Sequence, residues 1–258
     1  MPTYFPFNKI NTERLSCCFT WDDNSFGHSE IHLIFKDFGL NTTFYIVPGE
    51  PEFALKYAEQ YSRLSLAGHE IGSHTYTHPH MTTLTVGEAQ SEFIKAITAI
   101  TALTSIYPST FAFPHHDNNN LLVQLVKDVH FETRNTLKNA SRLSLKTNTS
   151  IINVREQLKT AIARHSNVTF SGHSVISPPD SFYEPNYEPV NRQLVIDILR
   201  TLSDKSMPFE VLTFEQSAMK EYIKAHTVYD KGGCFLENNQ MSFLASFGID
   251  SIRLESII

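Results

Sequence analysis

Short strand-like runs alternate with stretches of helical apolar spacing along most of this chain of 258 residues, and that alternation restricts the fold more than any other feature. Such runs occur at residues 15–20, 42–47, 69–73, 110–113, 130–136, 167–171 and 209–212. A repeated strand–helix order is typical of a parallel sheet whose helices cover its outer face. We therefore predict an α/β fold, a distorted, TIM-barrel-like (β/α) barrel of about seven strands.

Helix boundaries can be read from the segments between these runs. Pro51 and Gly68 delimit one predicted helix, with proline at its start and glycine at its end. Thr85 and Glu88 form a capping-box pattern ahead of another apolar stripe. These signals indicate that the apolar stretches between the strands are amphipathic helices.

Two segments depart from the alternation. Residues 177–185 contain too much proline for regular structure, and we expect nearby aromatic side chains to line a groove there. These aromatic residues are Phe182, Tyr183 and Tyr187. Residues 226–258 follow the last helix and carry glycine and asparagine pairs between short apolar runs. We predict a barrel domain at residues 1–225 and a C-terminal extension at residues 226–258, an appended hairpin or edge strand packed on the barrel.

Composition and charge argue against several classes of protein. The net charge is −6 and no basic cluster is present, which disfavours nucleic acid and anionic membranes as partners. No apolar run is long enough to span a bilayer. Three cysteines without framework spacing, two of them adjacent at Cys17 and Cys18, argue against a disulfide scaffold.

The first 13 residues lack a basic stretch followed by an apolar stretch, so no signal peptide is predicted. A cytoplasmic location is therefore expected. Secretion by another route, or an earlier removal of a leader, are the alternatives. The sequence makes no prediction of oligomeric state.

Two groups of polar residues lie where predicted strands end. Asp22 and Asp23 follow the first strand, and adjacent carboxylates repel each other unless a cation lies between or beside them. His74 and His78 follow the third strand, and imidazoles at this spacing can point the same way. One aspartate and two histidines make a three-ligand metal site with room for water, which is the catalytic pattern. His28 and His32 have the same spacing, and we interpret them as a solvated helix face.

These two groups resemble motifs of a known family. Thr20-Trp21-Asp22-Asp23-Asn24 resembles the T-F-D-D-G motif of the polysaccharide deacetylases, the NodB-homology domain of carbohydrate esterase family four. Ser73-His74-Thr75-Tyr76-Thr77-His78 resembles the H-[ST]-x-x-H motif of the same family. The resemblance covers roughly residues 15–225.

The resemblance implies a role for each candidate residue. Asp23, His74 and His78 would hold one divalent metal ion, zinc in the first place, with cobalt or nickel as alternatives. Asp22 would be the general base that activates water, and His173 the general acid that protonates the leaving group. The backbone N–H of His115, next to Pro114, would help to stabilise the tetrahedral oxyanion.

One departure from the family pattern concerns the partner of the base. Ala112 occupies the position where the family has an arginine. Arg134 lies at the end of the neighbouring predicted strand, and parallel strands about 5 Å apart are within an arginine's reach. We therefore predict that Arg134 pairs with Asp22 or with substrate. The alternative is a structural arginine bonded to Glu132 or to a loop carbonyl.

The resemblance implies a metal-dependent deacetylase that hydrolyses N-acetyl or O-acetyl groups of a polysaccharide or oligosaccharide. One alternative is a C–N hydrolase of a small amide or cyclic imide. Another is a non-catalytic carbohydrate-binding relative, which Ala112 would favour. The expected partner is an acetylated carbohydrate.

Overall fold

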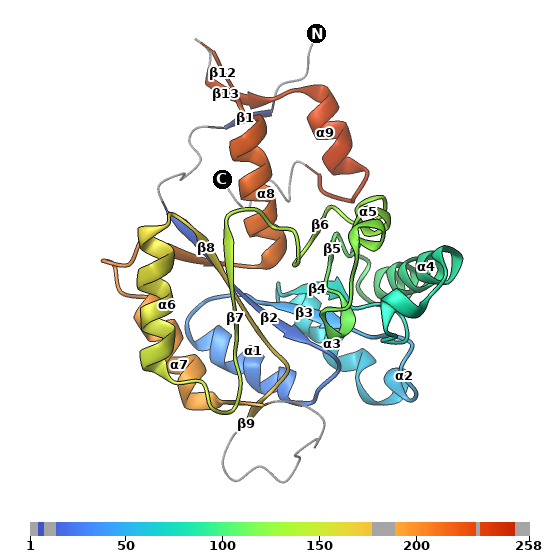
Figure 1. Ribbon diagram of the computed structural model, residues 1–258, viewed down its shortest axis with the longest axis horizontal. Coiled ribbons are helices and arrows are strands. Elements are labelled where there is room, and N and C mark those ends of the chain that lie inside the picture. The colour runs from blue at the N-terminus through green and yellow to red at the C-terminus, as the bar shows by residue number, and fades with distance from the viewer. Residues whose placement is uncertain (1–4, 8–13, 177–188, 231–232, 251–258) are drawn as a thin grey trace.

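A parallel sheet forms the centre of the molecule, and β2 (Leu15–Asp22) lies in its middle (Figure 1). The computed structural model describes residues 5–7, 14–176, 189–230 and 233–250. The strand order is β6-β5-β4-β3-β2-β8-β7, and β11 pairs with the first half of β2. Every ladder in this sheet is parallel. The remaining strands are β3 (Thr43–Ile46), β4 (Glu70–Ser73), β5 (Thr110–Phe111), β6 (Glu132–Thr133), β7 (Ala140–Ser144), β8 (Asn167–Gly172) and β11 (Phe209–Leu212).

Helices pack against the outer face of this sheet and bury its apolar side chains. Phe19 of β2 is fully buried between the rings of Phe35 and Phe170, and the same core includes Ile198. The helices are α1 (Gly27–Asp37), α2 (Phe53–Lys56), α3 (Ala58–Leu66), α4 (Val86–Thr104), α5 (Asn120–Lys127), α6 (Ile151–Ala163) and α7 (Arg192–Leu202). The predicted α/β architecture of a distorted, barrel-like parallel sheet is confirmed.

Several local predictions are confirmed or corrected. Thr85 and Glu88 make both hydrogen bonds of the predicted capping box at the start of α4. The helix predicted between Pro51 and Gly68 is divided into α2 and α3, because Tyr57 leaves helical geometry at φ −121°. The strand predicted at residues 130–136 is shortened to β6. No helix in the described ranges is both long enough and apolar enough to cross a bilayer.

β7 is the strand of the central sheet that the sequence did not predict. Its side chains are polar or half-buried along most of its length, because it lies at the edge of the sheet with β8 as its neighbour. Within the described residues no strand ladder joins β7 to β6, so the barrel is open between these two edges. Arg142 of β7 bridges this opening by donating from Nη1 to Asn135 Oδ1 at 3.3 Å.

The chain after β11 continues into α8 (Phe214–His226) and a small antiparallel sheet at one end of the molecule (Figure 1). That sheet has the order β1-β13-β12, formed by β1 (Phe5–Phe7), β12 (Val228–Asp230) and β13 (Gly233–Leu236). α9 (Asn238–Ala245) follows, and its Leu244 packs with Ile223 of α8 and with Phe131. The division of the chain at residue 225 stays a prediction.

Short elements complete the opposite end of the molecule. β9 (Val175–Ile176) and β10 (Val190–Asn191) form a two-stranded parallel pair there (Figure 1). Two 3₁₀ turns, η1 (Met81–Thr83) and η2 (Pro114–His116), follow β4 and β5. The proline-rich segment with Phe182, Tyr183 and Tyr187 lies outside the described residues.

Candidate metal centre and active site

The carboxyl ends of neighbouring parallel strands bring the candidate residues to one edge of the sheet. β2 ends at Asp22, β4 ends one residue before His74, and β8 ends one residue before His173. Asp22 is in register with Tyr45 of β3, and β3 pairs in turn with β4. Barrel enzymes build their sites on this edge, as predicted for this chain.

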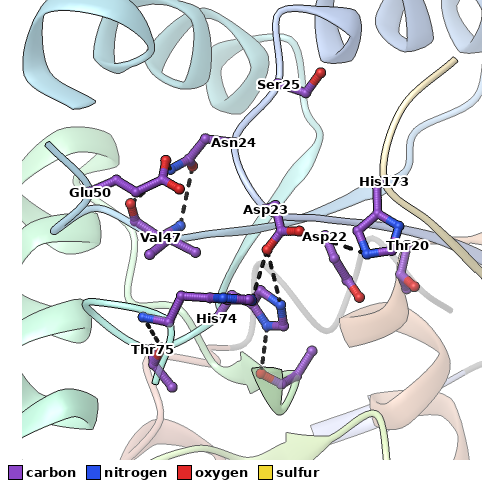
Figure 2. A network of polar contacts seen from close by, with 12 residues as sticks. Thr20, Asp22, Asp23, Asn24, Ser25, Val47, Glu50, His74, Thr75 and His173 are labelled. Atoms are coloured by element: carbon purple, nitrogen blue, oxygen red, sulfur yellow. Dashed lines mark hydrogen bonds and ion pairs between the residues drawn. The ribbon is translucent and has the colours of Figure 1, made fainter. Parts of the chain in front are cut away.

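Asp23, His74 and His78 form a cluster with metal-ligand chemistry. One oxygen or nitrogen from each residue lies within 4.8 Å of the others, and in the described part of the chain no other group of three such residues is found. Asp23 Oδ1 is 3.5 Å from Nε2 of His74 and 3.0 Å from Nε2 of His78. Figure 2 shows Asp23 directed toward the ring of His74.

Two observations show that these residues fit a metal ion. His74 Nδ1 lies 2.8 Å from the carbonyl oxygen of Ala112, and because a carbonyl only accepts, Nδ1 carries the proton. The lone pair of Nε2 is then directed at the cluster, which is the tautomer that metal ligation requires. Ligands of a tetrahedral zinc ion at about 2.1 Å are roughly 3.4 Å apart, close to the spacing of Asp23 and the two histidines.

The backbone of this cluster is strained. Asp23, Thr75 and His78 have positive φ values of 68°, 68° and 60°, a conformation that costs L-residues about 1–2 kcal/mol each. His78 N–H donates to Thr75 Oγ1 at 3.0 Å, which closes the loop between the two histidines. Strain that the surrounding structure sustains is characteristic of functional sites.

Arg134 forms a bidentate ion pair with Asp22, as predicted from strand order. Its Nη1 and Nη2 donate to Asp22 Oδ1 and Oδ2 at 2.5 and 2.6 Å, and Nη1 also donates to Thr20 Oγ1 at 3.0 Å. The guanidinium carbon is 5.4 Å from the ring centroid of Tyr45. Both charged side chains are almost fully buried. Burial alone would raise the pKa of Asp22, but the Arg134 charge and its hydrogen bonds hold that pKa well below its usual range.

His173 approaches the cluster from the side of β8. Its Nε2 is 3.7 Å from Asp23 Oδ2, and its backbone carbonyl accepts a hydrogen bond from His28 Nε2 at 2.8 Å. His28 is fully buried, so the expectation of a solvated face at His28 and His32 is wrong. Burial lowers the pKa of His28 to about 4, which keeps it neutral. His32 is also engaged, through Nδ1, with His69 Nε2 at 2.8 Å.

His115 and Pro114 form part of the 3₁₀ turn after β5. The imidazole of His115 meets that of His78 edge-on, with centroids 4.5 Å apart, and stacks on His80 at 4.1 Å. His115 has a φ of 54°, and within the described residues its backbone N–H donates to no acceptor. This amide is therefore available as a donor to a ligand. His115 lines a pocket of about 470 Å³ together with all three cluster residues.

Several residues of the site were not identified from the sequence. Asn24 exchanges two hydrogen bonds with the backbone of Val47, from Nδ2 at 2.9 Å and to Oδ1 at 3.2 Å, and so joins the ends of β2 and β3 (Figure 2). Glu50 and Lys146 add a negative and a positive charge to the pocket wall. Asn24 belongs to a recognised motif, whereas Glu50 and Lys146 lie outside any motif in the sequence.

Known proteins resemble this chain in sequence over nearly half of its length. The family model named polysaccharide deacetylase matches residues 9–133. Residues 9–133, just under half of the chain, thus match the polysaccharide deacetylase family. A chitin deacetylase from Pestalotiopsis sp is 26% identical over 117 residues, which are 45% of this chain. The chain spans 39% of that relative's length.

Several solved structures share the fold. The Xyl-CE4 domain of a multidomain xylanase from the hindgut metagenome of Trinervitermes trinervoides is 18% identical, with a TM-score of 0.58 over 81% of this chain and 91% of that one. The peptidoglycan deacetylase PdaC from Bacillus subtilis is 17% identical, with a TM-score of 0.55 over 84% and 96%. A CE4 family pseudoenzyme from Bacillus anthracis is 16% identical, with a TM-score of 0.51 over 81% and 66%.

The family match includes both motifs and ends just before the unusual arginine. Asp22, Asp23, His74 and His78 lie inside residues 9–133, whereas Arg134 is the next residue after the match. His173 is also beyond it. The match therefore gives no information on Arg134 or His173, whose contacts are described above.

Proposed function

We propose that this chain is a metal-dependent hydrolase that removes acetyl groups from an N-acetylated or O-acetylated polysaccharide or oligosaccharide. One observation carries the proposal: the adjacent carboxylates of Asp22 and Asp23 have different partners. Asp23 faces two imidazoles, whereas Asp22 is bonded to the guanidinium of Arg134. This separation gives one carboxylate the environment of a ligand and the other that of a base.

The proposed cofactor is one divalent ion held by Asp23, His74 and His78, with zinc preferred and cobalt or nickel as alternatives. When bound, such an ion would polarise the acetyl carbonyl and acidify the attacking water. The fixed tautomer of His74 and the left-handed backbone of Asp23 support this assignment. Glu50 is near these ligands on the pocket wall, and we assign it no step in the reaction.

The remaining residues supply proton transfer and charge stabilisation. Asp22 accepts a proton from the attacking water, and its low pKa keeps it ionised at neutral pH. His173 donates a proton to the leaving nitrogen or oxygen as the acyl bond breaks, giving acetate and the free amine or alcohol. The backbone N–H of His115 donates to the oxyanion of the tetrahedral intermediate.

Arg134 also bears on the two alternatives. The non-catalytic alternative was favoured by Ala112, because the family's arginine is missing there. Arg134 provides an equivalent charge from another strand, which supports a catalytic role. The chitin deacetylase and peptidoglycan deacetylase among its relatives favour a carbohydrate substrate over a small amide or cyclic imide.

The proposal is tested by measuring acetate release with added Zn²⁺ or Co²⁺. The substrates are chitooligosaccharides, peptidoglycan fragments, acetylxylan and, as a comparison, a small cyclic imide. Release from at least one carbohydrate, abolished by a chelator, is the expected result. Turnover of the cyclic imide alone would favour the small-amide alternative, and inactivity on the whole panel despite metal uptake would favour the non-catalytic one.

A further inference from the structure

Glu92, on α4, holds the loop that connects the two histidines of the cluster. Its Oε2 accepts hydrogen bonds from the backbone N–H groups of Tyr76 and Thr77 at 2.9 and 2.7 Å. Its Oε1 accepts from the Thr77 hydroxyl at 2.9 Å. Three donors from two consecutive residues thus converge on one carboxylate, and hydrogen bonds to a charged acceptor are about twice as strong as neutral ones.

The loop needs such an anchor because of its backbone conformation. Thr75 and His78 both have positive φ values, and the residues held by Glu92 lie between them. The Tyr76 peptide is fastened on its other side as well, because its carbonyl accepts from Gly49 N–H at 2.8 Å. A Cβ atom at Gly49 would lie 2.5 Å from that carbonyl oxygen, so the approach is close. The loop is therefore clamped between α4 and the segment after β3.

The two histidine ligands are fixed in different ways. The His74 ring is oriented by its own hydrogen bond to the Ala112 carbonyl. His78 follows directly after the two residues that Glu92 binds, and its Nε2 is 3.0 Å from Asp23 Oδ1. Its direction toward the cluster depends on the backbone that Glu92 holds.

We propose that Glu92 is a positioning residue that directs His78 toward Asp23 and thereby sets the metal affinity of the cluster. The statement about metal affinity rests on the proposed function. Groups that orient metal ligands from outside the coordination sphere typically change metal affinity by about 10–100-fold when they are removed. Glu92 acts on the backbone before the ligand, one step further from the ion.

The chain supplies a matched control four residues earlier on the same helix. Glu88 also accepts a backbone N–H and a hydroxyl, both from Thr85, at 2.8 and 2.7 Å. Those bonds cap α4 and do not touch the histidine loop. Glu92→Ala and Glu88→Ala therefore remove the same chemical group from one helix, with and without contact to the loop.

The first measurement is the zinc dissociation constant of the full chain, by competition with a chromophoric chelator. Glu92→Ala should weaken zinc binding by about tenfold or more, whereas Glu88→Ala should match the wild type within about twofold. The zinc dissociation constant of Glu92→Gln, which keeps one acceptor oxygen, should lie between those of the wild type and Glu92→Ala. The visible absorption of the Co²⁺-loaded protein should change in Glu92→Ala and not in Glu88→Ala, because it reports the ligand geometry.

The second measurement needs no metal. Hydrogen–deuterium exchange at the Tyr76 and Thr77 amides should accelerate in Glu92→Ala and stay at the wild-type rate in Glu88→Ala. Wild-type zinc affinity and unchanged exchange in Glu92→Ala would overturn the inference. If wild type binds no zinc, the proposed function fails, and the exchange rates still decide whether Glu92 holds the loop.

Discussion

Arg134 and Asp22, 112 residues apart in the chain, meet in a bidentate ion pair inside the barrel. Nη1 and Nη2 approach Oδ1 and Oδ2 at 2.5 and 2.6 Å, the parallel geometry in which arginine and carboxylate bind most strongly. Neither side chain is accessible to solvent to any large extent. A buried pair of this kind fixes the orientation of Asp22 and keeps it ionised, so its removal has predictable effects.

Replacing Arg134 should impair catalysis and shift its pH dependence. In Arg134→Ala both the bidentate contact and the positive charge are lost, and kcat should fall by about tenfold or more. Without the guanidinium, burial dominates and the pKa of Asp22 rises, so the acidic limb of the kcat/KM profile should move to higher pH. Arg142→Ala is the control for the position of the acidic limb, because Arg142 bonds Asn135 and not Asp22. A profile that is identical in Arg134→Ala and wild type would contradict the assignment.

The same pair predicts a loss of stability. Arg134→Ala leaves a buried carboxylate without its partner, which typically costs about 3–5 kcal/mol in the free energy of unfolding. Because the pKa of Asp22 is lowered in the fold, this stabilisation is present above the ordinary aspartate pKa and is lost as the pH falls toward the lowered value. Urea unfolding of wild type and Arg134→Ala at pH 7 measures the difference. A change below about 1 kcal/mol would mean that solvent enters and solvates Asp22.

Substitutions of the two adjacent aspartates should differ in their effects on metal binding and on turnover. Asp22→Asn should retain zinc and lose turnover, because an amide does not accept the proton from water. Asp23→Asn should weaken zinc binding, because a neutral oxygen is a poorer ligand. Metal content and acetate release, measured on the same preparations, compare the two. Near-normal kcat in Asp22→Asn would assign the base to another group.

The histidine cluster predicts the metal content of the purified protein. Wild type should contain close to one divalent ion per chain, and His74→Ala or His78→Ala should lose it while remaining folded. His80→Ala serves as the control, because His80 stacks on His115 but does not belong to the cluster. Elemental analysis after dialysis measures the content. Equal metal in all four proteins would place the ion elsewhere.

Glu70 lies at the end of β4 far from His74, and its environment should make the stability of the protein depend on pH. Burial, together with the nearby Glu215 carboxylate, raises the pKa of Glu70 from 4.5 to about 7. The folded protein therefore favours the protonated form of Glu70. The contribution of Glu70 to the free energy of unfolding should be greatest below pH 4.5 and should decline as the pH rises through 7. The free energy of unfolding should decline by at most about 3 kcal/mol, because each unit of difference in the pKa of Glu70 corresponds to about 1.36 kcal/mol.

Glu70→Gln isolates this effect. The carboxylate accepts hydrogen bonds from Thr43 Oγ1 at 2.7 Å, from the Glu215 N–H at 2.8 Å and from the Thr110 hydroxyl. An amide oxygen keeps two of these bonds, and the Thr110 hydroxyl can turn to accept from the amide nitrogen. Between pH 5 and pH 8 the free energy of unfolding of wild type should fall relative to that of Glu70→Gln, because the amide does not ionise. A difference that is constant over this range would show that Glu70 stays ionised.

The sequence predicted what depends on strand order and missed what depends on contacts across the fold. Arg134 was predicted because the carboxyl ends of parallel strands meet at one edge, even though β6 is much shorter than expected. β7 was missed because an edge strand with half-exposed polar side chains lacks the apolar pattern of a buried strand.

Two side chains show why spacing alone is insufficient. His28 and His32 have the spacing of His74 and His78, but His28 is buried because its ring nitrogens bond Tyr61 and the His173 carbonyl. Glu92 binds backbone groups 15 and 16 residues earlier, and such a contact leaves no periodic signal in the sequence. Histidine spacing therefore indicates a candidate, and the partners decide its role.

The opening between β6 and β7 lies beside the pocket that His115 and His173 line. His115 follows β5 on one side of that opening, and His173 follows β8 on the other. A closed ladder of backbone hydrogen bonds would hold the two walls at one separation. The ladders from β5 to β8 join the walls on the other side, whereas across the opening a side-chain contact, the Arg142–Asn135 bond, takes the place of a ladder. The width of the pocket on this side therefore depends on a side-chain contact that a single substitution can remove.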